Sequence, residues 1–100
     1  MTVSTATDGD RHRIFVVEDH PTTLAGIHSI LEHFGKHIIL ETLTTLQEAR
    51  EAIQRLQPNL IVLDLQLPQS AGESASTEAG IQFLKELMQT YPSLNIAVHT

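Results

Sequence analysis

The chain has 100 residues and a formal net charge of -6, with 12 acidic side chains against 6 Lys and Arg. This length allows one domain, and the negative charge disfavours direct binding to a nucleic-acid backbone, which requires clustered basic residues. No apolar run reaches the length of a membrane span, and the absence of cysteine excludes disulfides, thiolate metal sites and a cysteine nucleophile. A reducing cytoplasm fits this composition, and we expect a cytoplasmic protein.

The first residues are small and polar, and they lack the basic cluster and apolar core of a signal peptide. We expect residues 1–12 to form a disordered tail and residues 13–100 to form the domain. A first strand is predicted at Ile14–Val17. A helix follows, because Pro21 suits a first helical turn and Gly35 indicates its end. Its buried stripe is predicted from apolar residues at helical spacing: Leu24, Ile27, Leu31 and Phe34.

A second strand is predicted to begin at residues 38–40. Thr45 and Glu48 then match a capping box, in which each side chain satisfies an open backbone donor of the other. Pro58 follows the end of this second helix, whose apolar face is predicted from Ala49, Ala52, Ile53 and Leu56.

The last elements are a third helix and a fourth strand at residues 95–98. A small, polar stretch at residues 69–76 precedes the helix, and Pro92 ends it. Its predicted stripe consists of Ile81, Leu84, Leu87, Met88 and Tyr91. Strands that alternate with helices imply parallel units with right-handed crossovers.

The third strand lies within residues 59–68, a short apolar run bounded by Pro58 and Pro68. Such a run is typical of a strand buried on both faces. It contains one carboxylate, Asp64, which is costly to bury unless it is paired or binds a metal. Asp64 either ends the strand and caps a turn, or lies at the carboxyl end of the sheet, where open α/β sheets bind ligands.

A second apolar run ends in two adjacent acids, Glu18 and Asp19. Two parallel strands ending in acids would bring Glu18, Asp19 and Asp64 to one edge of the sheet. Three carboxylates in one crevice repel each other unless a positive charge lies between them. Mg²⁺ prefers oxygen ligands of this kind, so the pattern predicts a magnesium site.

Three segments together resemble the receiver domain of two-component response regulators: the acidic pair within residues 16–21, Asp64 with a Pro four residues later, and a Thr closing residues 96–100. The resemblance begins at Arg13. The His20-Pro21 pair is most similar to the subgroup that carries a helix-turn-helix output domain. The resemblance implies a flavodoxin-like three-layer α/β fold with strand order 2-1-3-4 of the fuller 2-1-3-4-5. Receivers continue through a fifth strand that ends in a lysine and through final helices. The resemblance therefore implies a partial domain that is truncated after the fourth strand.

The resemblance also implies residue roles. Asp64 would be the nucleophile that accepts a phosphoryl group from a histidine kinase. Asp19 and Glu18 would hold Mg²⁺ with Asp64, and Gln66 would contribute its backbone carbonyl. Thr100 would donate a hydrogen bond to a phosphoryl oxygen, although a threonine that simply ends a strand is the alternative.

The expected function is phosphoacceptor signalling rather than enzymatic catalysis, with control of a transcriptional output domain outside this chain. We expect no nucleic-acid or membrane contact from these residues, and association through the exposed fourth strand. One alternative is a pseudo-receiver that acts only as a protein-interaction module. Another is an Asp-nucleophile phosphohydrolase, which usually carries a second carboxylate where this chain has Gln66.

Two other features carry expectations. The stretch at residues 69–76 should be mobile, because its small polar side chains bury too little surface to offset ordering entropy. The loop from Pro68 to Gly80 is several residues longer than receivers usually have there, and it should overhang the acidic site. His33 and His37 have ligand-like spacing, but Gly35 lies between them, so we expect surface histidines, as for His28. His20 either borders the acidic site or has a structural role.

Overall fold

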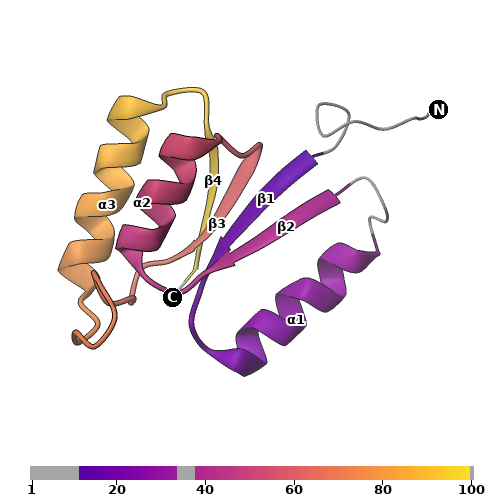
Figure 1. Ribbon diagram of the computed structural model, residues 1–100, viewed down its shortest axis with the longest axis horizontal. Coiled ribbons are helices and arrows are strands. Elements are labelled where there is room, and N and C mark those ends of the chain that lie inside the picture. Colours follow the sequence, from indigo (N-terminus) through magenta and orange to yellow (C-terminus); the bar gives the residue numbers. More distant parts are fainter. Residues whose placement is uncertain (1–11, 34–37, 100) are drawn as a thin grey trace.

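The computed structural model describes residues 12–33 and 38–99, where four strands alternate with three helices (Figure 1). The elements are β1 (His12–Val17), α1 (Pro21–Glu32), β2 (Ile38–Leu43), α2 (Leu46–Arg55), β3 (Leu60–Asp64), α3 (Thr77–Thr90) and β4 (Asn95–His99). β1 includes His12, at the boundary of the predicted tail, and the remaining tail residues lie outside the described part of the chain.

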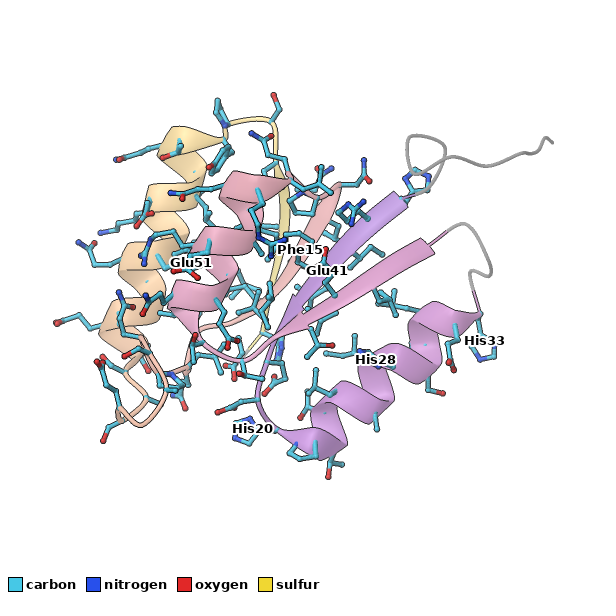
Figure 2. The ribbon with its side chains drawn as sticks, viewed as in Figure 1. Phe15, His20, His28, His33, Glu41 and Glu51 are labelled. Atoms are coloured by element: carbon cyan, nitrogen blue, oxygen red, sulfur yellow. The ribbon has the colours of Figure 1, made fainter. Side chains whose placement is uncertain are left out.

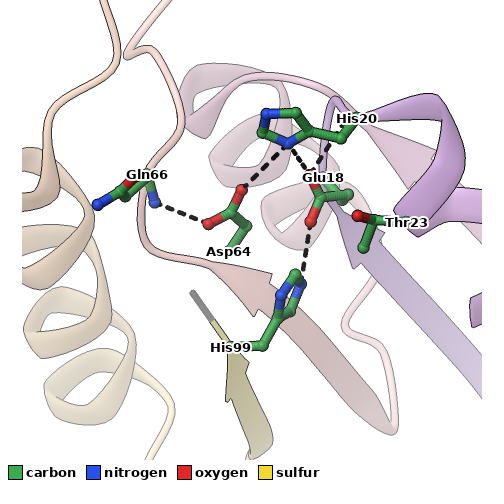
Figure 3. Close-up of a pocket in the computed structure, with 6 residues that line it drawn as sticks. All are labelled: Glu18, His20, Thr23, Asp64, Gln66 and His99. Atoms are coloured by element: carbon green, nitrogen blue, oxygen red, sulfur yellow. Dashed lines mark hydrogen bonds and ion pairs between the residues drawn. The ribbon is translucent and has the colours of Figure 1, made fainter.

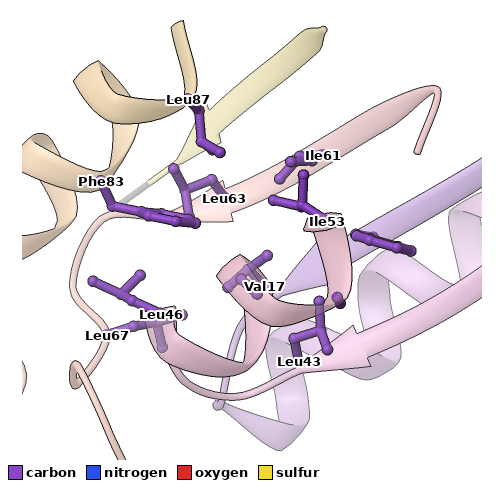
Figure 4. Packing of buried hydrophobic residues seen from close by; sticks show 12 residues of the cluster. Val17, Leu43, Leu46, Ile53, Ile61, Leu63, Leu67, Phe83 and Leu87 are labelled. Carbon is purple, nitrogen blue, oxygen red and sulfur yellow. The ribbon is translucent and has the colours of Figure 1, made fainter. Parts of the chain in front are cut away.

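The sheet has the predicted order β2-β1-β3-β4, and every strand pair is parallel. α2 and α3 cover one face, where they share a core with the inward side chains of the sheet (Figure 4). α1 covers the other face. His28 of α1 contacts Thr42 of β2, and Thr42 is paired with Val16 of β1, which is buried but is not part of that core. These three layers confirm the predicted α/β fold, and because the strands are parallel, all their carboxyl ends meet at one edge.

Packing is uneven between the two faces of the sheet. The main core consists of twelve buried residues between the sheet and the two helices on its other side: Phe15, Val17, Leu43, Leu46, Ala49, Ala52, Ile53, Ile61, Leu63, Leu67, Phe83 and Leu87. By contrast, none of the residues of α1 is fully buried. Leu24, Ile27 and Leu31 of the predicted stripe are half-buried, and Phe34 lies outside the described residues. α2 and α3 therefore supply most of the apolar cover of this sheet.

The predicted starts of the first two helices, at Pro21 and after Thr45, are confirmed. α1 begins at Pro21 and ends at Glu32, earlier than the predicted end. The Thr45 hydroxyl accepts the Glu48 amide at 3.1 Å, as a capping box requires. The Glu48 carboxylate, however, accepts the backbone amide of Thr44 at 2.9 Å rather than that of Thr45, so only half of the box forms.

The predicted face of α3 was partly wrong. Ile81 and Met88 are 40% and 59% exposed, whereas Phe83 and Leu87 are both only 1% exposed. The physical reason is the close approach of Gly80 to the backbone of Leu65, which turns the Gly80 side of the helix toward the sheet. Leu56 of the second predicted stripe is also exposed, because α2 ends one residue before it.

The connection between β3 and α3 contains a turn of its own. The Glu73 amide donates to the Ser70 carbonyl at 3.2 Å, and Gly72 takes a left-handed φ of 88° that favours glycine. The Gln47 amide donates to the Gln69 carbonyl at 2.9 Å and ties the segment to α2. The mobility of this segment stays a prediction.

Among the helices in the described ranges, none has the length and apolar character needed to cross a bilayer.

Candidate functional site

A cavity of about 250 Å³ lies at the carboxyl edge of the sheet (Figure 3). It is lined by Glu18, His20, Thr23, Asp64, Gln66 and His99. Glu18 directly follows β1, Asp64 is the last residue of β3, and His99 is the last residue of β4. The sheet therefore brings together side chains that are far apart in the sequence.

Asp64 combines both of the interpretations open from the sequence. Asp64 is only 3% exposed. Its Oδ1 accepts a hydrogen bond from the backbone amide of Gln66 at 2.9 Å, so Asp64 does cap the turn after the strand. Its other oxygen, Oδ2, lies 3.9 Å from Nδ1 of His20 across the cavity (Figure 3). One oxygen is thus held by the turn while the other faces the cavity.

Glu18 is the most deeply buried carboxylate of the site, at 1% exposure. Its Oε2 contacts Nδ1 of His20 at 2.6 Å and accepts the backbone amides of His20 and Asp19 at 3.0 and 3.1 Å. Burial alone would raise the pKa of Glu18, but these contacts with His20 and the charge of His99 outweigh it and lower the pKa below its ordinary value. Glu18 is therefore held ionised.

His20 lies among the three acids at the mouth of the cavity. Its Nδ1 is 3.2 Å from Oδ1 of Asp19 as well as 2.6 Å from Glu18. The hydrogen bond to Glu18 and then the charges of Asp19 and Glu18 raise the pKa of His20. Of the two roles open from the sequence, the structure shows that His20 borders the site.

His99 is a site residue that the sequence reasoning missed. Its Nε2 lies 3.1 Å from Oε1 of Glu18, yet this buried nitrogen makes no aligned hydrogen bond within the described residues. Its position beside Thr100 at the end of the fourth strand was the available signal. The other described histidines lie elsewhere: His12 is exposed at the start of β1, His28 contacts Thr42 at 3.1 Å, and His33 is exposed at the end of α1.

The acidic cluster has the donor set of a metal site. Glu18, Asp19, His20 and Asp64 each offer one ligand atom, and these atoms all lie within 4.8 Å of one another. Carboxylate oxygens of this number fit Mg²⁺, which is usually held by one or two carboxylates and waters. Gln66 lines the cavity, and ligation by its carbonyl stays a prediction. Thr100 and His37 lie outside the described residues.

The segment at residues 69–76 does not line the cavity. Instead, its first residue accepts a hydrogen bond from the Gln47 amide at the start of α2. Near its other end, Ala75 pairs with Pro68 in an isolated antiparallel bridge. The expected overhang of the loop from Pro68 to Gly80 above the acidic site stays a prediction.

Comparison with known proteins is consistent with this geometry. Residues 14–100 match the response regulator receiver domain. Among curated proteins, the chain is 32% identical over 88 residues to a protein-glutamate methylesterase/protein-glutamine glutaminase of Rhizobium etli, and 34% identical over 79 residues to one of Gluconobacter oxydans. These alignments cover 88% and 79% of this chain but only 23% and 20% of the relatives.

Solved structures show the same fold at low sequence identity. The response regulator MaeR bound to beryllium trifluoride is similar with a TM-score of 0.71 at 24% identity, over 89% of this chain and 66% of that one. The RcsB response regulator of Salmonella typhimurium is similar with a TM-score of 0.69 at 21% identity, over 89% of this chain and 41% of that one. With the parallel sheet and the acidic edge, the match over residues 14–100 shows that the chain belongs to the response regulator receiver domain family.

Proposed function

We propose that Asp64 accepts a phosphoryl group from a histidine kinase, and that Mg²⁺ supports the transfer. The observation that carries this proposal is the burial of Asp64 at the carboxyl edge, with one oxygen facing a cavity lined by Glu18 and His20. Phosphoryl transfer needs positioning and charge neutralisation more than covalent chemistry by the protein. This cavity supplies a positioned carboxylate and a cluster of cation ligands.

The proposed roles differ between the site residues. The amide of Gln66 holds Oδ1 of Asp64 and so orients the carboxylate that forms the bond to phosphorus as the bond to the donor nitrogen breaks. Glu18, Asp19, Asp64 and the Gln66 carbonyl would hold Mg²⁺, which would neutralise charge on the phosphoryl oxygens. Thr100 would donate its hydroxyl to one of those oxygens.

The output is proposed to lie outside this chain, which spans about a fifth of the curated relatives it matches. A transcriptional output is supported by the fold shared with RcsB, which has been solved bound to a promoter with a phosphomimetic. A second candidate is an enzymatic output that acts on protein glutamate or glutamine side chains, favoured by the names of the curated relatives. The coding sequence downstream of Thr100 would distinguish these two outputs.

Incubation with a small phosphodonor and Mg²⁺, followed by mass measurement, tests the proposal. With the full-length protein, we expect a stable acyl phosphate on the wild type and none on Asp64→Asn, because the amide keeps the shape but loses the nucleophile. Glu51→Gln, an exposed carboxylate on α2, is the matched control and should be phosphorylated normally. Steady release of phosphate without accumulation would favour the phosphohydrolase, and no reaction would favour the pseudo-receiver.

A further inference from the structure

We propose that the hydroxyl of Thr23 donates a hydrogen bond to the leaving atom of the phosphodonor, which makes Thr23 a specificity-determining residue for transfer to Asp64. Thr23 lies in the first turn of α1 and lines the cavity at the carboxyl edge of the sheet. The inference rests on the proposed function, because it concerns the same phosphoryl transfer. It adds a contact with the part of the donor that departs, to which the proposed roles assign no residue.

Thr23 differs from the other residues that line the cavity because its side chain is not engaged by a neighbour. Within the described residues the Thr23 hydroxyl has no hydrogen-bond partner, and no dashed line reaches it in Figure 3. By contrast, Nδ1 of His20 contacts Glu18 at 2.6 Å, and the side-chain amide of Gln66 donates to Thr77 at 3.1 Å. The half-buried Thr23 therefore offers the cavity a neutral hydroxyl that a bound donor can use.

The position of Thr23 fits the path of the reaction. In phosphoryl transfer the attacking and leaving atoms lie roughly in line, with phosphorus between them. Oδ2 of Asp64 faces the His20 side of the cavity at 3.9 Å, and His20 directly precedes α1. Figure 2 shows this start of α1, marked by His20, at the opposite end of the helix from His33. Attack by Oδ2 therefore directs the leaving atom toward the start of α1, where the Thr23 hydroxyl lies.

The hydrogen bond acts on the atom that receives the electron pair of the broken bond. As Oδ2 of Asp64 bonds to phosphorus, the bond from phosphorus to the nitrogen of a phosphohistidine breaks, and its electron pair stays on that nitrogen. This nitrogen is a better hydrogen-bond acceptor after the break than before it. The hydrogen bond from Thr23 is therefore stronger in the transition state than in the bound donor, which accelerates the transfer, and the hydroxyl keeps its proton throughout.

Phosphorylation of the full-length protein by phosphoimidazole tests the proposal, because this probe releases the same ring that a kinase histidine would release. Thr23→Val, which keeps the shape but loses the hydroxyl, should lower the rate constant by about three- to tenfold, the effect of one hydrogen bond. Thr23→Ser keeps the hydroxyl and should retain the wild-type rate. Thr22→Val is the matched control, because Thr22 is the exposed neighbour that does not line the cavity, and it should also retain the wild-type rate.

Binding of beryllium trifluoride, the phosphomimetic bound in the MaeR structure, separates contact with the leaving atom from general damage to the site. This probe has no leaving group, so Thr23→Val should bind it with the wild-type affinity. An unchanged phosphorylation rate in Thr23→Val, or an equal loss of rate and of beryllium trifluoride affinity, would overturn the inference while leaving phosphorylation of Asp64 intact. A wild-type protein that phosphoimidazole does not phosphorylate at all would instead refute the proposed function, and this inference with it.

Discussion

The substitution of Gly80 by alanine should destabilise the domain, against the usual effect of this change in a helix. Alanine is normally favoured over glycine in a helix by about 0.5–1 kcal/mol. At this position, however, an added Cβ would lie 2.7 Å from the carbonyl carbon of Leu65 and 2.8 Å from its Cα, and closer still to its carbonyl oxygen. Carbon atoms in good contact are about 3.5–4.0 Å apart, so either α3 or the backbone that follows β3 must move.

The size of the effect follows from which atoms clash. They belong to the backbone, which cannot rotate away as a side chain can. Overpacking of a core costs about 1–3 kcal/mol, which exceeds the gain in helix propensity. We therefore expect a net loss of about 1–2 kcal/mol, which lowers the melting temperature of a domain of this size by about 4–8 °C for each kcal/mol.

Gly26 provides the matched control, because it lies within α1 and a Cβ there would meet nothing within 4 Å. Gly26→Ala should therefore stabilise the chain by about 0.5–1 kcal/mol. Urea denaturation followed by far-ultraviolet circular dichroism would measure both variants against the wild type. A Gly80→Ala chain as stable as the wild type would show that α3 does not approach the Leu65 backbone as closely as the structure has it.

Four further predictions can be tested on the same chain. Asp19→Asn should weaken Mg²⁺ binding strongly in a metal titration, and unchanged affinity would remove Asp19 from the proposed site. Arg50 donates to Glu86 at 2.8 Å and lowers its pKa below the ordinary 4.5, so this pair stabilises the fold at neutral pH and the contribution is lost as the pH falls through that lowered value. Because both side chains are partly exposed, Glu86→Gln should cost less than about 1 kcal/mol at neutral pH, and denaturation in acid should show the difference disappear; a difference independent of pH would contradict this. Val98 is 43% exposed on the edge strand β4, so Val98→Lys should reduce any self-association seen by sedimentation, and an unchanged association would place the contact elsewhere. Amide hydrogen exchange at residues 69–76 should be fast, and protection equal to that of β3 would indicate a structured segment instead.

The order and type of the elements could be predicted from the sequence because they depend on local patterns. Short apolar runs predicted the strands, and the alternation of strands with helices predicted a parallel sheet. The same reasoning placed Asp64 and the Glu18-Asp19 pair at one edge, since parallel strands share their carboxyl ends. The cluster of Glu18, Asp19 and Asp64 in the structure follows from this topology.

The orientation of the helices could not be derived in this way. α3 carries apolar residues around much of its surface, so periodicity alone gave a stripe that included the exposed Ile81 and Met88 and left out the buried Phe83. The orientation of α3 depends on the close approach of its Gly80 to the backbone of Leu65, which follows β3. Such contacts depend on the tertiary packing of both partners.

By itself, the sequence of this protein determined the α/β fold, the acidic edge and the position of Asp64, because each depends on spacing along the chain. Only the tertiary structure decided that His20 lies between the three carboxylates and that His99 faces Glu18. His99 belongs to the last strand and Glu18 follows the first, so no local pattern links them. They come together because β3 pairs with both β1 and β4, and this pairing brings the carboxyl ends of these three strands to one cavity.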